Sequence, residues 1–81
     1  ELNLYPNPAS SVATISFDGF AEGSGQLAIY DLIGKQVIKQ DIAVTTGNNN
    51  RKLDLSTLDK GAYMVRVTYN GLTRNCKLIV K

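Results

Sequence analysis

The chain has 81 residues with 9 Lys and Arg, 7 Asp and Glu, one Cys and no His, which gives a formal net charge of +2. We expect a single domain over residues 1–81, because a chain of this length buries only about 60% of the surface that it exposes when unfolded. The scattered basic residues exclude a nucleic-acid footprint, the single Cys excludes an internal disulfide, and no apolar stretch approaches the ~20 residues of a membrane helix. No signal peptide opens the chain, so if the protein is exported we expect the signal to lie on a longer precursor or elsewhere in this chain.

Two prolines stand two residues apart in "LYPNPAS", residues 4–10. Each proline fixes its own φ, removes an N–H from any strand ladder and biases the residue before it, Tyr5 or Asn7, towards an extended conformation. One interpretation is a kink that ends a strand and blunts a sheet edge, where proline is tolerated. The other is a recognition tag formed by Tyr5, Pro6, Asn7 and Pro8.

Further along the chain, several stretches alternate apolar residues with others at the two-residue period of a half-buried strand. They are "SVATISF", "GQLAIYD", "RKLDL", "AYMVRVTY" and "RNCKLIVK". The inward faces predicted by this alternation carry Ala13, Ile15, Phe17, Leu27, Ile29, Leu53, Leu55, Tyr63, Val65, Val67, Tyr69, Cys76, Leu78 and Val80. The outward face of the last stretch carries Lys77, Ile79 and Lys81.

Turn signals separate these stretches. "DLIG" ends in Gly34, which suits the left-handed position of a bulged hairpin, and Asn70 with Gly71 predicts a two-residue type I′ hairpin turn. "LSTLDKG" is at most one turn of helix ending at Gly61. The polar "VTTGNNNRK" is predicted as the longest loop, with residues 42–44 either part of that region or a short strand before it.

Short strands with turns at this spacing predict an all-β fold, a small immunoglobulin-like antiparallel β-sandwich of about seven strands. The Cys, Trp and Cys pattern of antibody domains is missing. The apolar faces alone must therefore hold the two sheets together.

No catalytic, cofactor or metal site is predicted. Without His, neither a Ser-His-Asp nor a Cys-His arrangement can form. Cys76 lies on an inward face, which favours a buried, unreactive thiol over a nucleophile. The carboxylates are spread over turns and strand ends, and with no Trp and with Tyr63 and Tyr69 facing inward an aromatic platform for sugars is not favoured. We therefore expect a non-enzymatic protein with no small-molecule substrate and no nucleic-acid partner.

Four motifs, in this order, resemble the type A C-terminal sorting domain of the type IX secretion system: "LYPNPAS", "LAIYDLIGKQV", "LDLSTLDKGAYMVRV" and the terminal "KLIVK". The resemblance covers nearly the whole chain. It implies a folded module at the C-terminal end of a larger exported protein of a Gram-negative bacterium, which directs that cargo from the periplasm through the outer membrane to the cell surface. The implied partners are the outer-membrane translocon, its shuttle components and a sortase-like cysteine protease, which cuts upstream of the first motif and attaches the cargo to a surface lipopolysaccharide.

The positions that match the family motifs are Tyr5, Pro6, Asn7 and Pro8 in the first, Gly34 and Lys35 in the second, Gly61 and Tyr63 in the third and residues 77–81 in the last. We expect the last strand to lie at a sheet edge and to offer unpaired N–H and C=O groups to a partner strand. In this hypothesis Lys77, Ile79 and Lys81 form the docking face, while Leu78 and Val80 hold the strand to the core.

Three alternatives stay open at this point. The lysines of the last strand have a second use, protection against edge-to-edge aggregation, and the four motifs have a second interpretation as requirements of the fold alone. The alternative function is an accessory carbohydrate-binding or adhesive β-sandwich domain.

Overall fold

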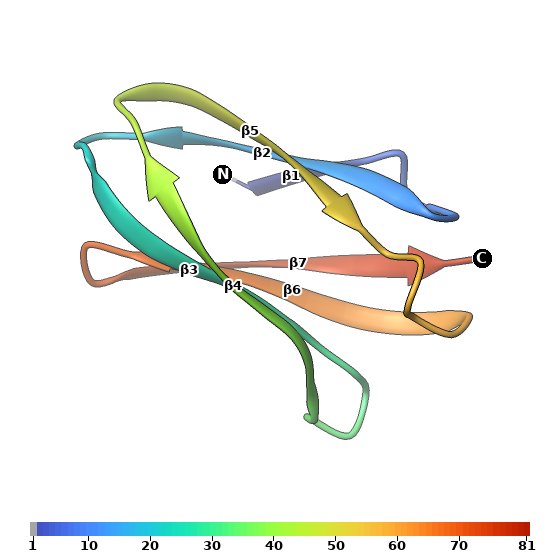
Figure 1. Cartoon of the computed structure of the whole chain (residues 1–81). Helices are drawn as coiled ribbons and strands as arrows, with labels where there is room; N and C mark the ends of the chain where they lie inside the picture. Colours follow the sequence, from blue (N-terminus) through green and yellow to red (C-terminus); the bar gives the residue numbers. More distant parts are fainter. Residues whose placement is uncertain (1) are drawn as a thin grey trace.

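The chain folds into two stacked antiparallel sheets, as seen in a computed structural model that describes residues 2–81 (Figure 1). The strands are β1 (Leu2–Tyr5), β2 (Val12–Gly19), β3 (Gly23–Tyr30), β4 (Gln36–Val44), β5 (Gly47–Asp54), β6 (Gly61–Tyr69) and β7 (Leu72–Val80). One sheet has the order β1-β2-β5 and the other the order β4-β3-β6-β7. Within the described residues there is no helix, and the predicted immunoglobulin-like sandwich of about seven strands is confirmed.

The core lies between the sheets and is built from the faces that the alternation predicts. Ile15 of β2, Leu27 and Ile29 of β3 and Leu78 of β7 are completely buried. Cys76 is the exception, because it is only half-buried on an edge strand that has a neighbour on one side alone. Even this partial burial raises the pKa of the Cys76 thiol, since the thiolate would lose hydration.

The polar stretch predicted as the longest loop is instead a tight connection followed by a strand, so that prediction was wrong. β4 continues to Val44, and β5 pairs with β2 from its first residue, Gly47, which lies opposite Gly19. The inward position near the start of β5 is held by Asn49, whose Nδ2 donates to the carbonyl oxygens of Thr45 and Gly47 at 2.9 and 3.0 Å. A buried amide satisfied by backbone groups replaces the apolar residue there, which hides the strand from a reading of periodicity.

Two predicted turns are confirmed by their backbone angles. Asn70 and Gly71 have φ values of 49° and 76° between β6 and β7, as the type I′ turn requires. Gly34 has a φ of 87° in the turn between β3 and β4, and the register of that pair shifts between Ile29 and Tyr30, as in a bulged hairpin.

The stretch "LSTLDKG" before β6 forms a hydrogen-bonded turn and no helix. The N–H of Leu58 donates to the carbonyl of Leu55 at 3.0 Å, and Gly61 already belongs to β6. Beside it, the Asp54 carboxylate accepts the Ser56 N–H at 3.0 Å. Hydrogen bonds from the Ser56 side chain and backbone lower the pKa of Asp54 below its usual value, because they favour the charged carboxylate.

Candidate functional site

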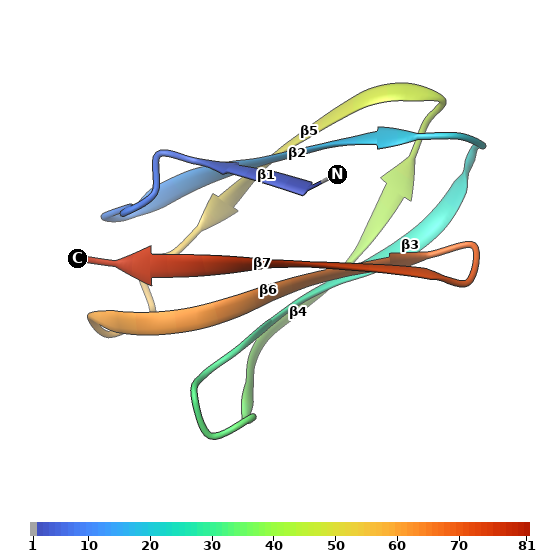
Figure 2. The ribbon, with the colours of Figure 1, turned by 180° about the vertical axis from the view of Figure 1, so that it is seen from behind.

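The proline segment after β1 crosses from one sheet to the other. β1 and β7 are edge strands of different sheets and lie beside one another on one side of the sandwich (Figure 2). Ala9, which is completely buried, forms a parallel bridge with Val80. Its N–H donates to the carbonyl of Ile79 and its carbonyl accepts the N–H of Lys81, both at 2.8 Å. The predicted kink is therefore confirmed, and the edge that it covers belongs to β7.

Asn7 extends this pairing with its side chain. Pro6 and Pro8 have no N–H, so the backbone on either side of Asn7 cannot donate to a neighbouring strand. The Asn7 amide supplies the missing groups: Oδ1 accepts the N–H of Ile79 at 3.0 Å, and Nδ2 donates to the carbonyl of Lys77 at 2.8 Å. A carboxamide carries the same donor and acceptor as a peptide unit, so Asn7 acts as a strand residue. We call residues 7–9 together with residues 77–81 the terminal clamp.

The clamp corrects the prediction of a free edge along the last strand. The two-residue turn makes Tyr69 and Leu72 a hydrogen-bonded pair. From Leu72 onwards, every second residue therefore points its backbone N–H and C=O groups towards β6, and the residues between them point theirs towards the open edge of the sheet. Among these edge residues, the N–H and carbonyl of Ile79 and the carbonyl of Lys77 are bonded within the clamp. Strand addition at residues 77–81 is therefore blocked in this conformation.

The clamp joins the two predicted partner-binding segments through Asn7, but the Tyr5 side chain lies on the outer face of the β1-β2-β5 sheet, away from the lysines of β7. Tyr5 is 50% exposed and donates from its hydroxyl to Oδ1 of Asn50 at 3.2 Å. Pro6, Pro8, Lys77 and Lys81 are exposed, and Ile79 is half-buried. Leu78 and Val80 are buried in the core, as predicted for residues that hold β7 in place.

The remaining predicted motif residues lie outside the clamp and shape the fold. Gly34 lies in the β3–β4 turn, and Asn70 with Gly71 forms the β6–β7 turn. Gly61 begins β6, and the buried Tyr63 donates from its hydroxyl to the carbonyl of Asp59 at 2.6 Å. The contribution of the β6 and β6–β7 turn residues to the clamp is indirect, since they position the strand pair β6–β7 that carries it.

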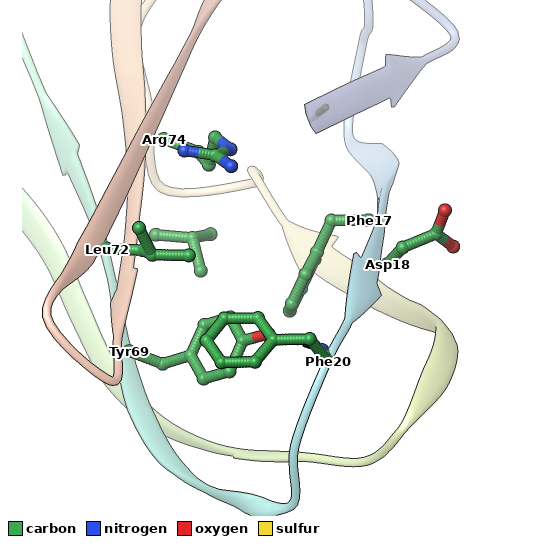
Figure 3. A pocket seen from close by; sticks show the side chains of 7 residues that line it. Phe17, Asp18, Phe20, Tyr69, Leu72 and Arg74 are labelled. Atoms are coloured by element: carbon green, nitrogen blue, oxygen red, sulfur yellow. Dashed lines mark hydrogen bonds between the residues drawn. The ribbon is translucent and has the colours of Figure 1, made fainter.

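An aromatic cluster closes the end of the sandwich at the β6–β7 turn (Figure 3). The Phe20 ring lies 5.4 Å from that of Tyr69 at 39°, and the Phe20 N–H donates to the Tyr69 hydroxyl at 2.8 Å. The cavity beneath them measures about 40 Å³ and is lined by Phe17, Asp18, Phe20, Val67, Tyr69, Leu72 and Arg74. Ligand pockets usually measure about 300–1,000 Å³, so this cavity is a packing gap with room for little more than a water molecule.

Residues 2–81 contain no group of three or more His, Cys, Asp or Glu side chains that could hold a metal ion. In the same range, no helix has the length and apolar character needed to span a membrane. Tyr63 and Tyr69 are buried on the core face of β6, so neither forms an aromatic platform for a sugar.

Comparison with known proteins gives two matches. The family described as "Secretion system C-terminal sorting domain" matches residues 3–81. Beta-agarase D of Zobellia galactanivorans is 30% identical over 81 residues, which cover 99% of this chain and 15% of the agarase. The chain thus spans about a seventh of the length of this curated relative. Both matches include the two halves of the terminal clamp.

Two features of the clamp were missed by reasoning from sequence. The burial of Ala9 and the pairing of Asn7 with β7 join positions 70 and more residues apart, and no local pattern reports such a contact. The sequence contains a partial signal for this pairing. Pro6 and Pro8 have no N–H, so Asn7 between them is the residue that can donate a hydrogen bond.

Proposed function

Because the chain belongs to the secretion system C-terminal sorting domain family, we propose that residues 1–81 act as one non-enzymatic module whose terminal clamp is the surface recognised during export. Domains of this family are C-terminal sorting signals of type IX secretion, and they address an upstream cargo for export towards the outer membrane and the cell surface. The observation that carries the proposal is the meeting of the first and last family motifs in one clamp.

The exposed side chains of the clamp suit recognition of a folded surface. Pro6 and Pro8 are fixed in φ, and Asn7 ties them to β7, so a partner meets a surface that is already ordered. Lys77 and Lys81 add two cations beside Ile79. Since the backbone groups of residues 77–79 are largely occupied, we propose recognition through these side chains and not through strand addition.

The finer assignments follow from the type IX pathway. We assign recognition of the clamp to outer-membrane translocon and shuttle components, met while the cargo passes through the periplasm. A sortase-like cysteine protease then removes the module by cutting upstream of Tyr5.

The module is tested by fusing residues 1–81 to a periplasmic reporter in a bacterium with an active type IX system. We expect the reporter to reach the cell surface or the medium. Retention of the reporter in the periplasm, with the module folded, would reject the proposal.

The clamp surface is tested by comparing variants of the fused module. Lys77→Ala with Lys81→Ala should block export and leave the melting temperature unchanged, because both side chains are exposed. Lys39→Ala with Lys52→Ala is the matched control, since these lysines are exposed on other strands. Leu78→Ala should lose export and stability together. Normal export of the Lys77 and Lys81 double variant would move the address to the segment from Tyr5 to Pro8.

A further inference from the structure

Two large aliphatic side chains stand almost fully in solvent at the tip of the β3–β4 hairpin. Leu32 is 80% exposed and Ile33 is 88% exposed. This hairpin reaches beyond the rest of the sandwich in both views (Figures 1 and 2). Exposed apolar residues that occur singly are common, whereas an adjacent pair at a protruding tip is a usual mark of an interaction site.

The turn that carries these side chains does not need them. The Asp31 carboxylate accepts the N–H of Ile33 at 3.1 Å and that of Lys35 at 2.9 Å. The Gly34 N–H donates to the Asp31 carbonyl at 3.1 Å, and the Asp31 N–H donates to the Lys35 carbonyl at 2.9 Å. Asp31 and Gly34 therefore set the conformation, and polar residues would serve as well at the two positions between them. The hairpin therefore holds Leu32 and Ile33 pointing outwards, where they add no buried apolar area to the core.

Two shallow grooves lie beside the hairpin. One, of about 300 Å³, lies between Leu32 and Ile33 and the start of β6 at Gly61 and Ala62. The other, of about 400 Å³, lies between Val37 and the β5–β6 connection at Leu58. A partner whose pocket receives the tip would thus have space for its pocket walls beside the hairpin.

The charges around the tip bear on what it meets. Asp31 and Asp59 line these grooves together with Lys35 and Lys60, so the rim has two anionic and two cationic side chains and no net charge. Binding to an anionic lipid surface favours an excess of cations, which this rim lacks. Two aliphatic side chains also fall far short of the roughly 1,200 Å² that a stable protein interface buries, so the tip alone does not hold two copies of the chain together and acts only beside another contact.

We infer that Leu32 and Ile33 are an anchor that inserts into an apolar pocket, rimmed by both signs of charge, on a protein component of the export machinery. This inference rests on the proposed sorting function and adds a second contact, on a different part of the fold from the terminal clamp. Buried aliphatic anchors of this kind dominate the affinity of an interface when their pocket excludes water. Loss of one such side chain weakens binding by about tenfold to a hundredfold.

The test uses the reporter fused to residues 1–81, with surface delivery and the thermal melt measured for each variant. Ile33→Ser is compared with Val12→Ser, because Val12 is also β-branched and is 47% exposed, on the other sheet. We expect Ile33→Ser to lower export at least tenfold, Leu32→Ser with Ile33→Ser to abolish it, and Val12→Ser to have no effect. All melting temperatures should match that of the parent.

A competition assay addresses the protein partner directly. The free domain, overproduced in the periplasm, should inhibit export of the parent reporter, and the Leu32→Ser with Ile33→Ser domain should inhibit at least tenfold less. Vesicles of phosphatidylethanolamine and phosphatidylglycerol are the lipid probe, and we expect no binding to them.

Each other outcome overturns the inference. If the parent reporter is exported and the double variant is exported equally, the tip is not an anchor, while the sorting function stands. Vesicle binding that is lost in the double variant would make a lipid surface the occupant. A parent domain that sediments as a dimer, with a monomeric double variant, would make a second copy the occupant. Failure of the parent reporter to leave the periplasm would reject the sorting function and this inference with it.

Discussion

Removal of the Asn7 side chain should open the β7 edge without emptying the core. Asn7→Ala deletes two hydrogen bonds, one from the Ile79 N–H to Oδ1 and one from Nδ2 to the Lys77 carbonyl. A hydrogen bond contributes about 0.5–1.5 kcal/mol net, and Asn7 is exposed, so water can partly replace it at both groups. We therefore expect a loss of about 1–2 kcal/mol in the free energy of unfolding, which for a domain of this size lowers the melting temperature by about 4–16 °C.

Hydrogen exchange of single amides gives the sharper assay. The Ile79 N–H should exchange faster in Asn7→Ala by more than the change in global stability explains, because its acceptor is gone. The Lys81 N–H, bonded to the Ala9 carbonyl, should follow global stability more closely. Asn3→Ala is the control, since Asn3 is an exposed asparagine on β1 whose side chain has no hydrogen bond among the described residues.

The reasoning would be refuted by equal behaviour of the two variants. If Asn7→Ala and Asn3→Ala both change stability by less than about 0.5 kcal/mol, the usual range for surface positions, the amide of Asn7 does not hold the clamp. Unchanged exchange at Ile79 would refute it independently of stability.

Three further predictions concern the fold and its titration. Leu78→Ala should destabilise the domain by about 2–5 kcal/mol in a denaturant titration, because the side chain is completely buried. Gly71→Val should lower the melting temperature more than Asn70→Gly, because both positions have positive φ and a β-branched residue resists it; equal melting temperatures would contradict the turn assignment. By NMR titration the pKa of Asp54 should lie below its usual value of 3.8 and rise in Ser56→Ala, and an unshifted titration would contradict the hydrogen bond. Since the folded pKa is the lower one, the stability that Asp54 adds is present above pH 3.8 and is lost as the pH falls through the folded pKa.

Much of the fold could be predicted from the sequence, because strands with one buried face repeat every second residue. The faces of β2 and β6 follow directly from Ile15 and Val65 and their alternating neighbours, and the turn at Gly71 follows from its backbone requirement. The first half of β5 was missed because Asn49 and Arg51 occupy inward positions there, so the apolar period begins only at Leu53.

The candidate site was harder to predict than the fold. Both halves of the clamp were identified, since the proline segment and the terminal motif stand out locally. Their contact was not, because it joins Asn7 to Ile79 through a side chain, and strand pairing between distant segments has no local signature. For the same reason, the backbone groups at residues 77–81 were predicted to be unpaired, whereas Asn7 and Ala9 bond to them.

Because of the clamp, the surface that we propose for recognition forms only when the 81-residue chain is complete and folded. Asn7 and Ile79 are 72 residues apart, so their contact closes a loop that contains β2 to β6 and most of β7. Such closure costs chain entropy that is recovered only when β7 has packed onto β6, and contacts of this range form late or together with the rest of the fold. A chain that stops short of β7, or that has not yet collapsed, lacks the paired segments altogether. A partner that recognises the clamp therefore distinguishes a sorting module that is complete and folded from one that is truncated or unfolded.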